Sequence, residues 1–302
     1  MSKPDDITVD QAKEFYDDRY LKGYMSEWPA AKKQRVAELV RSLPLPKTGK
    51  VLDYGCGAGV FTEVLKASLP NWTVCGVELS DVALELARQR VKNCRFLTAA
   101  EIAGEAPFDL IFTHHVLEHV GSLHDVFEDM SRLSAPRGYM LHILPCGNAG
   151  SFEQRLASSR RNGIRTADGG QFYFEDPGHL RRVTSAELAA ELEPFGFRLR
   201  ASWFANQFWG SLDWITDLNR SFVWTVVNPS EAASVGARLR MSWWAVWMMA
   251  LQAARHPPGA FPKFLAGPAD NFLRARALAE WRTRQHDPAA SEMYLLFQRG
   301  AE

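Results

Sequence analysis

The sequence has no excess of charge of one sign and no long hydrophobic run. Lysine plus arginine number 35 and aspartate plus glutamate number 35, so the formal net charge at pH 7 is zero. Such a chain has no global field that attracts nucleic acid or an anionic membrane. The longest aromatic-apolar run, residues 243–254, is well short of the roughly 20 residues that span a bilayer. We therefore expect neither nucleic acid nor a membrane as a partner.

Cysteine is scarce, and repeats and low-complexity tracts are missing. The four cysteines, Cys56, Cys75, Cys94 and Cys146, form no CxxC pair. Each stands in or beside an expected strand or turn, which is typical of reduced and mostly buried thiols. The first ten residues, MSKPDDITVD, lack the apolar stretch of a secretory signal. These observations predict a cytoplasmic globular protein.

Strand-like and helix-like patterns alternate in the first half of the chain. Apolar strand-like segments fall at residues 50–54, 73–79, 95–99, 108–113 and 139–146. Helical patterns lie between them, at residues 60–69, 81–91 and 122–133, and Ser80 is placed to cap the second of these helices. This alternation indicates α/β architecture with a parallel sheet.

The regular alternation ends after residue 146. Residues 147–183 read as a long polar connection, and loops of this length are usually functional or mobile. TSAE at 184–187 fits a capping box that opens a helix to about Glu193. Strand-like segments at 197–203 and 293–298 are expected to pair antiparallel at the sheet edge.

The residues between these two strands, 204–290, form an insertion that contains seven of the ten tryptophans. The insertion has helical patterns, and three alternatives stay open for its aromatic side chains. They can form a lid, a dimer surface, or the core of a small helical subdomain.

The stretch VLDYGCGAG, residues 51–59, has three glycines behind an apolar lead-in and one aspartate. Glycines spaced in this way let a backbone turn sharply and approach a ligand. A dinucleotide loop needs G-x-G-x-x-G, but counting from Gly55 the third position is Val60. The carboxylate of Asp53 would repel a diphosphate and suits a ligand with an ammonium group. The loop therefore argues against NAD and favours S-adenosylmethionine (SAM), which has an ammonium, a sulfonium and no phosphate.

Residues 50–146 resemble a class I SAM-dependent methyltransferase. The first motif of that family, (V/I)LDxGxGxG, matches residues 51–59. Glu78 stands at the end of the second strand, where the family places an acid on the ribose hydroxyls, and Leu79 would pack on adenine. The stretch FDLIFTHHVLEHV, residues 108–120, resembles the fourth strand and the segment that holds the methionine end.

The resemblance implies SAM as cofactor and a Rossmann-like, doubly wound, seven-stranded sheet in the order 3-2-1-4-5-7-6. It implies three domains: a helical cap (1–45), a SAM-binding domain (46–203, completed by 291–302) and a helical insertion (204–290), which is a lid or dimer surface. The cofactor-binding residues that it implies are Tyr20, Asp53, Gly55, Cys56, Gly57, Glu78, Leu79, Ala100, Glu101, Thr113 and His114.

Two parts of this set need comment. The family often has an aspartate after the third strand that binds the adenine amino group, and here the position falls on Ala100 with Glu101 next to it. We expect Glu101 or a backbone group to replace that aspartate. Tyr16, Tyr20 and Tyr24 stand at helical spacing, and in related enzymes such a segment folds over the cofactor; ordinary packing of a helix is the alternative.

Histidines are the candidates for acid–base chemistry. Methyl transfer is an in-line displacement at a sulfonium, so much of the catalysis comes from alignment and from exclusion of water. A base is needed only for a hydroxyl or protonated amine acceptor, and histidine suits that task near neutral pH. We take His115 as the first candidate base and His179 as the second. His114 and His142 are further candidates, and a structural role is the alternative for each.

The segment HHVLEHV also raises the question of a metal. On a helix, His115, Glu118 and His119 would share one face, because they lie at positions i, i+3 and i+4. Two imidazoles and a carboxylate can hold a divalent cation. LEHV-like endings are common in this fold, with the Glu and His packing locally, so we expect no metal.

The acceptor of the methyl group is the open question. Five arginines, at positions 160, 161, 165, 181 and 182, can bind an acidic acceptor or form a solvated surface. The leading hypothesis is O- or N-methylation of a small molecule in specialised or cell-surface metabolism, by a protein that can be a homodimer. One alternative is a SAM cyclase that releases methylthioadenosine, as azetidine-2-carboxylate synthases do. A second is a non-catalytic SAM-binding subunit.

Overall fold

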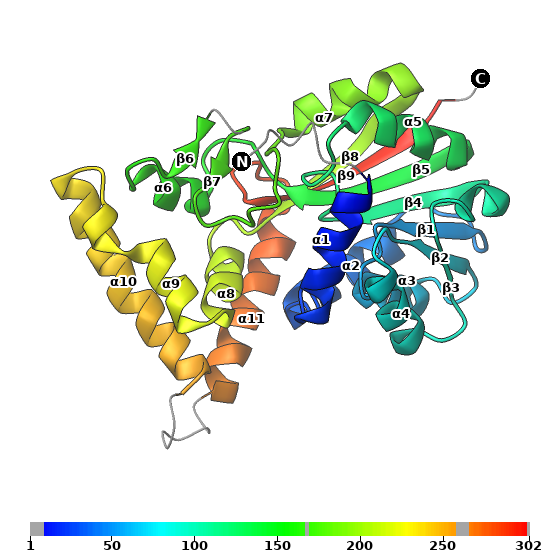
Figure 1. The fold of residues 1–302 in the computed structure, drawn as a ribbon. Helices are drawn as coiled ribbons and strands as arrows, with labels where there is room; N and C mark the ends of the chain where they lie inside the picture. Colours follow the sequence, from blue (N-terminus) through cyan, green and yellow to red (C-terminus); the bar gives the residue numbers. More distant parts are fainter. Residues whose placement is uncertain (1–8, 167–168, 258–265, 301–302) are drawn as a thin grey trace. The chain divides into compact units, whose positions relative to one another are not determined.

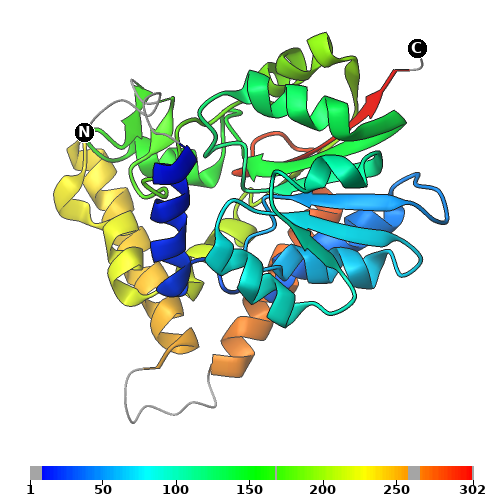
Figure 2. The ribbon, with the colours of Figure 1, turned by 45° about the vertical axis from the view of Figure 1, so that its right-hand side comes forward.

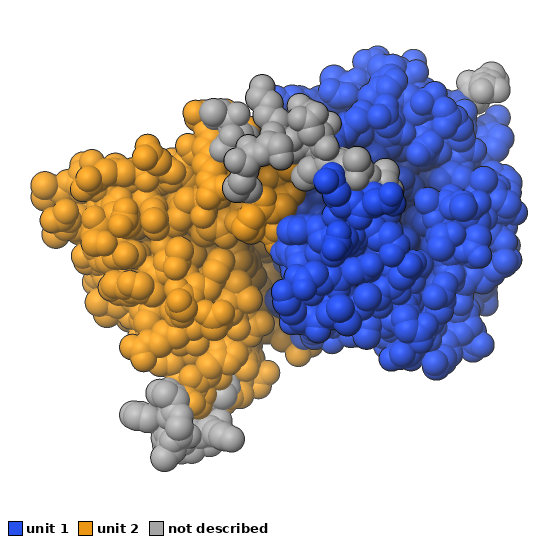
Figure 3. Space-filling model, in the orientation of Figure 1, with its two compact units in different colours: residues 1–144, 186–202, 294–302 blue, residues 145–185, 203–293 orange. Residues whose placement is uncertain are grey.

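The computed structural model describes residues 9–166, 169–257 and 266–300. The first eight residues of the expected cap lie outside this range. The chain divides into two compact units, which Figure 3 shows in different colours. Unit 1 comprises residues 1–144, 186–202 and 294–302, and unit 2 comprises residues 145–185 and 203–293.

Unit 1 is built on a seven-stranded sheet (Figure 1). The strands are β1 (Lys50–Tyr54), β2 (Thr73–Val77), β3 (Arg95–Leu97), β4 (Phe108–His114), β5 (Ser134–Pro145), β8 (Phe197–Ala205) and β9 (Glu292–Arg299). Their order is β3-β2-β1-β4-β5-β9-β8. The labels β6 and β7 belong to two short strands outside this sheet, so the order counted along the sheet's own strands is 3-2-1-4-5-7-6, as expected.

The central strands form because both of their faces are covered. β1 pairs in parallel with β2 and β4, and β4 pairs in parallel with β5. Leu52, Leu110 and Ile111 are completely buried. Parallel strands covered on both faces are nearly continuous apolar runs, which is why the sequence revealed them clearly.

Helices cover the sheet of unit 1. They are α1 (Val9–Leu21), α2 (Ala30–Ser42), α3 (Val60–Ser68), α4 (Asp81–Arg90), α5 (Leu123–Leu133) and α7 (Ser185–Leu192). Figures 1 and 2 show α3 and α4 on one side of the sheet and α5 and α7 on the other. The Ser80 hydroxyl accepts a hydrogen bond from the Ala83 N–H at 3.1 Å, which confirms the predicted cap of α4.

Unit 2 is mainly helical, as expected for the insertion. It contains α6 (Phe152–Ser158), β6 (Ile164–Arg165), β7 (Gln171–Phe172), α8 (Trp209–Asp217), α9 (Arg220–Val227), α10 (Val235–Arg255) and α11 (Ala266–Arg284). Its core includes Phe152, Ile215, Val223 and Met248. None of the helices in the described part of the chain is long and apolar enough to cross a membrane.

The reading of residues 147–183 as a polar connection is wrong. The segment contains α6 and the antiparallel pair of β6 and β7. Phe152, Phe172 and Phe174 from this segment are buried in the core of unit 2. These few aromatic side chains fix the segment, although its average composition is polar. The predicted SAM-binding domain, residues 46–203, includes this segment, whereas the segment belongs to unit 2. The predicted domain boundaries stay a prediction.

Candidate functional site

Unit 1 contains a cavity of about 470 Å³ at the carboxyl ends of β1, β2 and β4. Ligands of open α/β sheets bind in this place, and the volume is in the range of small-molecule sites. Predicted site residues that line the cavity are Tyr20, Asp53, Gly55, Cys56, Gly57, Glu78, Leu79, His114 and His115. The structure therefore brings most of the predicted set together.

The glycine loop forms one wall of this cavity. Gly55 and Gly57 have φ angles of +76° and +51°, in the left-handed region that favours glycine. A Cβ on Gly57 would lie 2.6 Å from the hydroxyl oxygen of Tyr20. The N–H groups of Gly55 and Cys56 donate to the carbonyl of Val77 at 2.8 and 3.0 Å. The glycines thus allow α1 to approach the loop closely, and the hydrogen bonds fix the loop to β2.

Asp53 is an almost fully buried carboxylic acid in the lining. Burial raises its pKa to about 7, while the hydrogen bond that it accepts from the Thr62 hydroxyl at 2.6 Å opposes this rise. The negative charge of Glu78 raises the pKa further. A cationic ligand in the cavity would stabilise the ionised carboxylate, so the site favours a ligand with an ammonium group.

Glu78 is held by the backbone around it. Its carboxylate accepts hydrogen bonds from the N–H groups of Gly57, Leu79 and Ser80 at 2.9, 2.8 and 3.1 Å. Burial raises its pKa, and these three backbone donors work against that shift. A carboxylate has about four acceptor sites, so roughly one remains for a ribose hydroxyl unless a backbone donor is displaced.

Aromatic side chains from α1 and from the segment between α1 and α2 form another part of the lining. Tyr16, Tyr20, Tyr24 and Trp28 all face the cavity. α1 is attached to the start of α4, because the Asp17 carboxylate accepts from the Ser80 hydroxyl at 2.5 Å and from the Val82 N–H at 3.3 Å. Of the tyrosines at helical spacing, Tyr16 and Tyr20 belong to a helix that contributes to the candidate site, whereas Tyr24 lies in the turn after this helix.

The region after β3 differs from the expectation. Ala99 lines the cavity, whereas Ala100 and Glu101 do not. The exposed Glu101 carboxylate accepts from the Thr98 N–H at 2.8 Å and from the Thr98 hydroxyl at 2.9 Å. Glu101 thus closes a local turn at the end of β3. An exposed acid that stabilises its own turn cannot be distinguished from an adenine ligand by sequence position alone.

Two further predicted residues lie in the core of unit 1. Thr113 is fully buried, and its hydroxyl lies 2.8 Å from Nδ1 of His142. Burial lowers the pKa of His142 to about 3, so this imidazole is neutral at physiological pH. Neither side chain is part of the cavity lining. The alternation of side chains along β4 and β5 directs both of them into the sheet core.

His115 is the centre of a polar cluster. The Nε2 atom of His115 lies 3.1 Å from Nζ of Lys32, and its Nδ1 lies 2.9 Å from Oε1 of Glu118. An ammonium group only donates, so a charged Lys32 donates to Nε2 and leaves the ring proton on Nδ1, facing Glu118. His115 also has a φ of +54°, an uncommon backbone conformation that occurs often at functional sites.

Sequence reasoning missed Lys32 and Trp28, which pack around the two histidines. The Trp28 ring lies 4.6 Å from that of His114 and 5.1 Å from that of His115, and Nζ of Lys32 lies 4.2 Å from its centre. Phe61 stacks on His114 at 3.7 Å. Lys32 is 83 positions from His115, so no local pattern reveals their contact.

His119 is the third residue of the divalent cation site that was considered together with His115 and Glu118. Residues 117–119 form a turn rather than a helix, closed by a 2.9 Å hydrogen bond from the His119 N–H to the Val116 carbonyl. His119 lines the cavity, with its ring 6.2 Å from that of Tyr16. The premise of one shared helical face is therefore wrong, and the expected lack of a metal stays a prediction.

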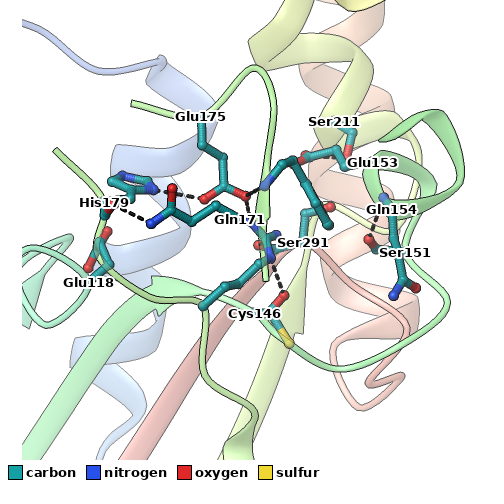
Figure 4. Close-up of polar contacts among 12 residues, drawn as sticks. Glu118, Cys146, Ser151, Glu153, Gln154, Gln171, Glu175, His179, Ser211 and Ser291 are labelled. Carbon is teal, nitrogen blue, oxygen red and sulfur yellow. Dashed lines mark hydrogen bonds and ion pairs between the residues drawn. The ribbon is translucent and has the colours of Figure 1, made fainter. Parts of the chain in front are cut away.

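His179 belongs to a polar network in unit 2 (Figure 4). Its Nδ1 lies 2.8 Å from Oε2 of Glu175, and Oε1 of the same carboxylate accepts from Arg182. Arg182 donates to the carbonyls of Cys146 and Ser291 at 2.8 and 3.0 Å. Burial raises the pKa of Glu175, but Arg182 and His179 outweigh it, so the pKa lies below its usual value. The role of His179 as a base stays a prediction.

Several of the arginines considered for an acidic acceptor have structural contacts within unit 2. Arg160 donates to the Thr225 carbonyl at 3.1 Å and lies over the ring of Tyr173. Arg161 donates to the Ala232 carbonyl at 3.1 Å. Together with Arg182, these side chains hold unit 2 together, which is neither of the two roles considered for them, acceptor binding and a solvated surface.

Comparisons with known proteins agree with this fold. Residues 24–202, more than half of the chain, match the family described as a methyltransferase domain (Methyltransf_23). The trans-aconitate 2-methyltransferase of Methylobacterium nodulans is 30% identical over 131 residues, covering 40% of this chain and 51% of that protein. The enzyme of the same name from Delftia acidovorans is 34% identical over 115 residues, covering 36% and 42%. The chain thus spans about half the length of these curated relatives.

Two solved structures cover nearly the whole chain. The [4+2]-cyclase SpnF is 16% identical, covers 98% of both chains and has a TM-score of 0.51. A chain of the complex between the Haloferax volcanii Trm112 methyltransferase activator and a methyltransferase is 12% identical, covers 98% and 99%, and has a TM-score of 0.51. At such low identity the likeness shows the fold alone.

Proposed function

Because the chain belongs to the class I SAM-dependent methyltransferases, we propose that it transfers the SAM methyl group to an oxygen or nitrogen atom of a small molecule. The observation that carries this proposal is the unit 1 cavity, whose lining combines the acids Asp53 and Glu78 with the imidazole of His115. The acids suit the cationic and hydroxyl-bearing cofactor, and the imidazole suits the acceptor.

Each cofactor contact in the proposal has a physical reason. The buried Asp53 carboxylate pairs with the SAM ammonium, because a neighbouring cation offsets the cost of a buried negative charge. Glu78 accepts a ribose hydroxyl on the acceptor site that its backbone donors leave. Leu79 and Ala99 supply apolar contact for the adenine. Tyr16, Tyr20 and Tyr24 exclude water from the sulfonium.

His115 is the proposed catalytic base for a hydroxyl or amine acceptor. The acceptor oxygen or nitrogen attacks the methyl carbon, the bond from carbon to sulfur breaks, and the cofactor leaves as the neutral thioether. The proton of the acceptor passes to Nε2 of His115, whose contact with Lys32 must then open. Glu118 faces Nδ1 and stabilises the imidazolium that results.

An acidic acceptor fits the same cluster without a base. A carboxylate is already ionised, and Lys32 together with His115 can position one of its oxygens against the methyl group. The curated relatives are named for trans-aconitate, which is itself a carboxylic acid. Methyl ester formation on a small carboxylic acid is therefore the first acceptor class to test.

The test is product analysis with SAM that carries a deuterated methyl group. The intact protein is incubated with SAM alone and with panels of small carboxylic acids, phenols and amines, including trans-aconitate. We expect a labelled methyl group on one acceptor, with an equal amount of S-adenosylhomocysteine. Methylthioadenosine from SAM alone, with no labelled acceptor in any panel, would instead identify a SAM-cleaving enzyme.

A further inference from the structure

Helix α10 of unit 2 carries apolar side chains on two opposite sides. Ala237, Met241, Ala245 and Met248 are buried against the rest of unit 2. The other side, here called the outer α10 face, consists of Val235, Leu239, Trp243, Val246 and Trp247. These side chains are 78%, 70%, 60%, 69% and 51% exposed.

Helical spacing places these five residues on one surface. Val235, Leu239 and Trp243 follow one another at intervals of four, and Val246 and Trp247 continue the same stripe one turn later. The rings of Trp243 and Trp247 are in edge contact at 5.8 Å. With about 3.6 residues per turn, Met241 and Met248 lie on the opposite side of the helix.

The exposed side chains of the outer α10 face are neighbours along one helix, whereas apolar exposure on an ordinary surface is scattered over single side chains. Soluble monomers rarely expose a contiguous apolar patch of more than a few hundred Å², and larger patches mark interaction sites. α9, which packs on α10, carries a further exposed tryptophan, Trp224, which is 46% exposed. Figures 1 and 2 show α10 at the outer side of the helices of unit 2. The exposed apolar side chains of the outer α10 face therefore indicate an interaction site.

The charge along α10 indicates what that partner is. The helix has 21 residues and no aspartate or glutamate. Arg238 and Arg240 are both exposed, and helical geometry puts one on each side of the apolar stripe. A second copy of this chain would bring the same basic side chains against them, so charge favours an acidic partner over self-association.

We propose that the outer α10 face binds the surface of an anionic lipid bilayer, with the helix lying in the plane of the interface. Trp rings prefer the level of the lipid headgroups, and arginine side chains reach from there to phosphate groups. The apolar side chains then enter the outer part of the hydrocarbon. The net charge of the whole chain is zero and does not reveal this local combination of apolar and basic side chains. For that reason we expected no membrane partner from the sequence.

Vesicle binding by the whole chain tests the proposal. Co-sedimentation is measured with phosphatidylcholine vesicles and with vesicles that also contain phosphatidylglycerol, and tryptophan fluorescence is followed in parallel. We expect binding to the anionic vesicles with a blue shift of the emission. The double variant Trp243→Gln/Trp247→Gln should bind these vesicles at least about tenfold more weakly than the wild type. Arg238→Gln/Arg240→Gln should also lose roughly tenfold on anionic vesicles.

Matched controls are the exposed apolar residues Leu86 and Leu199 of unit 1, replaced by Gln, which should leave vesicle binding unchanged. Circular dichroism verifies that each variant is folded. The proposal is overturned if the folded wild-type chain binds neither kind of vesicle, or if the Trp variant binds as the wild type does. It is equally overturned if light scattering shows a dimer that the Trp243→Gln/Trp247→Gln variant dissociates, because the face then joins two copies.

Discussion

At the scale of single residues, the candidate site depends on two buried acids whose negative charges are unfavourable without a cation beside them. Asp53 is buried beside Glu78, and burial raises the pKa of both carboxyl groups. The cost of this arrangement falls when a cation enters, since an opposite charge stabilises both carboxylates. The two acids thus favour a positively charged ligand over a neutral one.

The pKa of Asp53 gives a testable pH dependence. Below its pKa of about 7 the carboxyl group is protonated and cannot pair with an ammonium group. We therefore expect SAM affinity to fall as pH decreases from 7.5 to 5.5, by up to about tenfold per unit. Calorimetric titration at several pH values measures the fall. Asp53→Asn should bind weakly at every pH; a variant that keeps the wild-type slope would remove Asp53 from the explanation.

His115 offers a separate prediction about turnover. With an acceptor that must lose a proton, His115→Asn should lower kcat by about 10²–10⁴-fold, because the base is removed while the side-chain shape is largely kept. The Kd for SAM should stay within about threefold. Lys32→Met should lower kcat less, since the imidazole remains and only the cation that keeps the ring proton on Nδ1 is lost. The control is His124→Asn on α5, where the side chain is exposed.

At the scale of elements, polar contacts attach α1 to the start of α4 within unit 1. Asp17 accepts from Ser80 and Val82 at the start of α4, and Lys13 forms ion pairs with Asp17 and Asp81 at 3.1 and 2.8 Å. Burial raises the pKa of Asp17, but the hydrogen bonds from Ser80, Lys13 and Val82 outweigh it, so the pKa lies below its usual value. These contacts hold the tyrosines of α1 at the cavity.

Removing the Asp17 charge should therefore weaken cofactor binding, although Asp17 is not part of the cavity lining. For Asp17→Asn we expect a loss of about 1–2 kcal/mol in the attachment of α1, and roughly 5–30-fold weaker SAM binding. Stopped-flow measurements should assign this loss to faster dissociation, and hydrogen exchange in α1 should increase. Asp18→Asn is the matched control, because Asp18 is exposed and pairs with Lys22 one turn away. Equal effects of the two variants would contradict this role of α1.

Elements also show what the sequence could and could not reveal. The strands of the parallel sheet were recognisable because Leu52, Leu110 and Ile111 belong to continuous apolar runs. Residues 147–183 were not, because polar residues surround the aromatic side chains that anchor the segment. α6 and the pair of β6 and β7 depend on contacts with distant helices of unit 2, which no local pattern encodes.

The same distinction applies to the site. Asp53, Gly57 and Glu78 could be predicted as site residues, because they lie at or just after the carboxyl ends of β1 and β2. Parallel pairing of these two strands is enough to bring the three residues together. Lys32 is on α2, whereas His115 directly follows β4, so their contact depends on how α2 packs. Ala99 lines the cavity in place of Ala100 and Glu101, because the turn after β3 shifts the expected position.

At the scale of the whole molecule, the chain combines a SAM-binding unit with a mainly helical unit. Unit 1 contains the cavity and all of the predicted cofactor residues. Unit 2 contains His179, the arginine contacts and the outer α10 face. The curated relatives align over roughly half of their length, so the acceptor must be found by experiment.

Titration of SAM into the intact chain and two glutamate variants tests the central claim most directly. Glu78→Gln should raise the Kd for SAM about 10–100-fold, because a charge-assisted hydrogen bond to the ribose is lost. Glu101→Gln should leave the Kd within twofold of the wild type, because Glu101 bonds to Thr98 outside the cavity. Unchanged binding by Glu78→Gln, or an equal loss in Glu101→Gln, would contradict the proposed cofactor site.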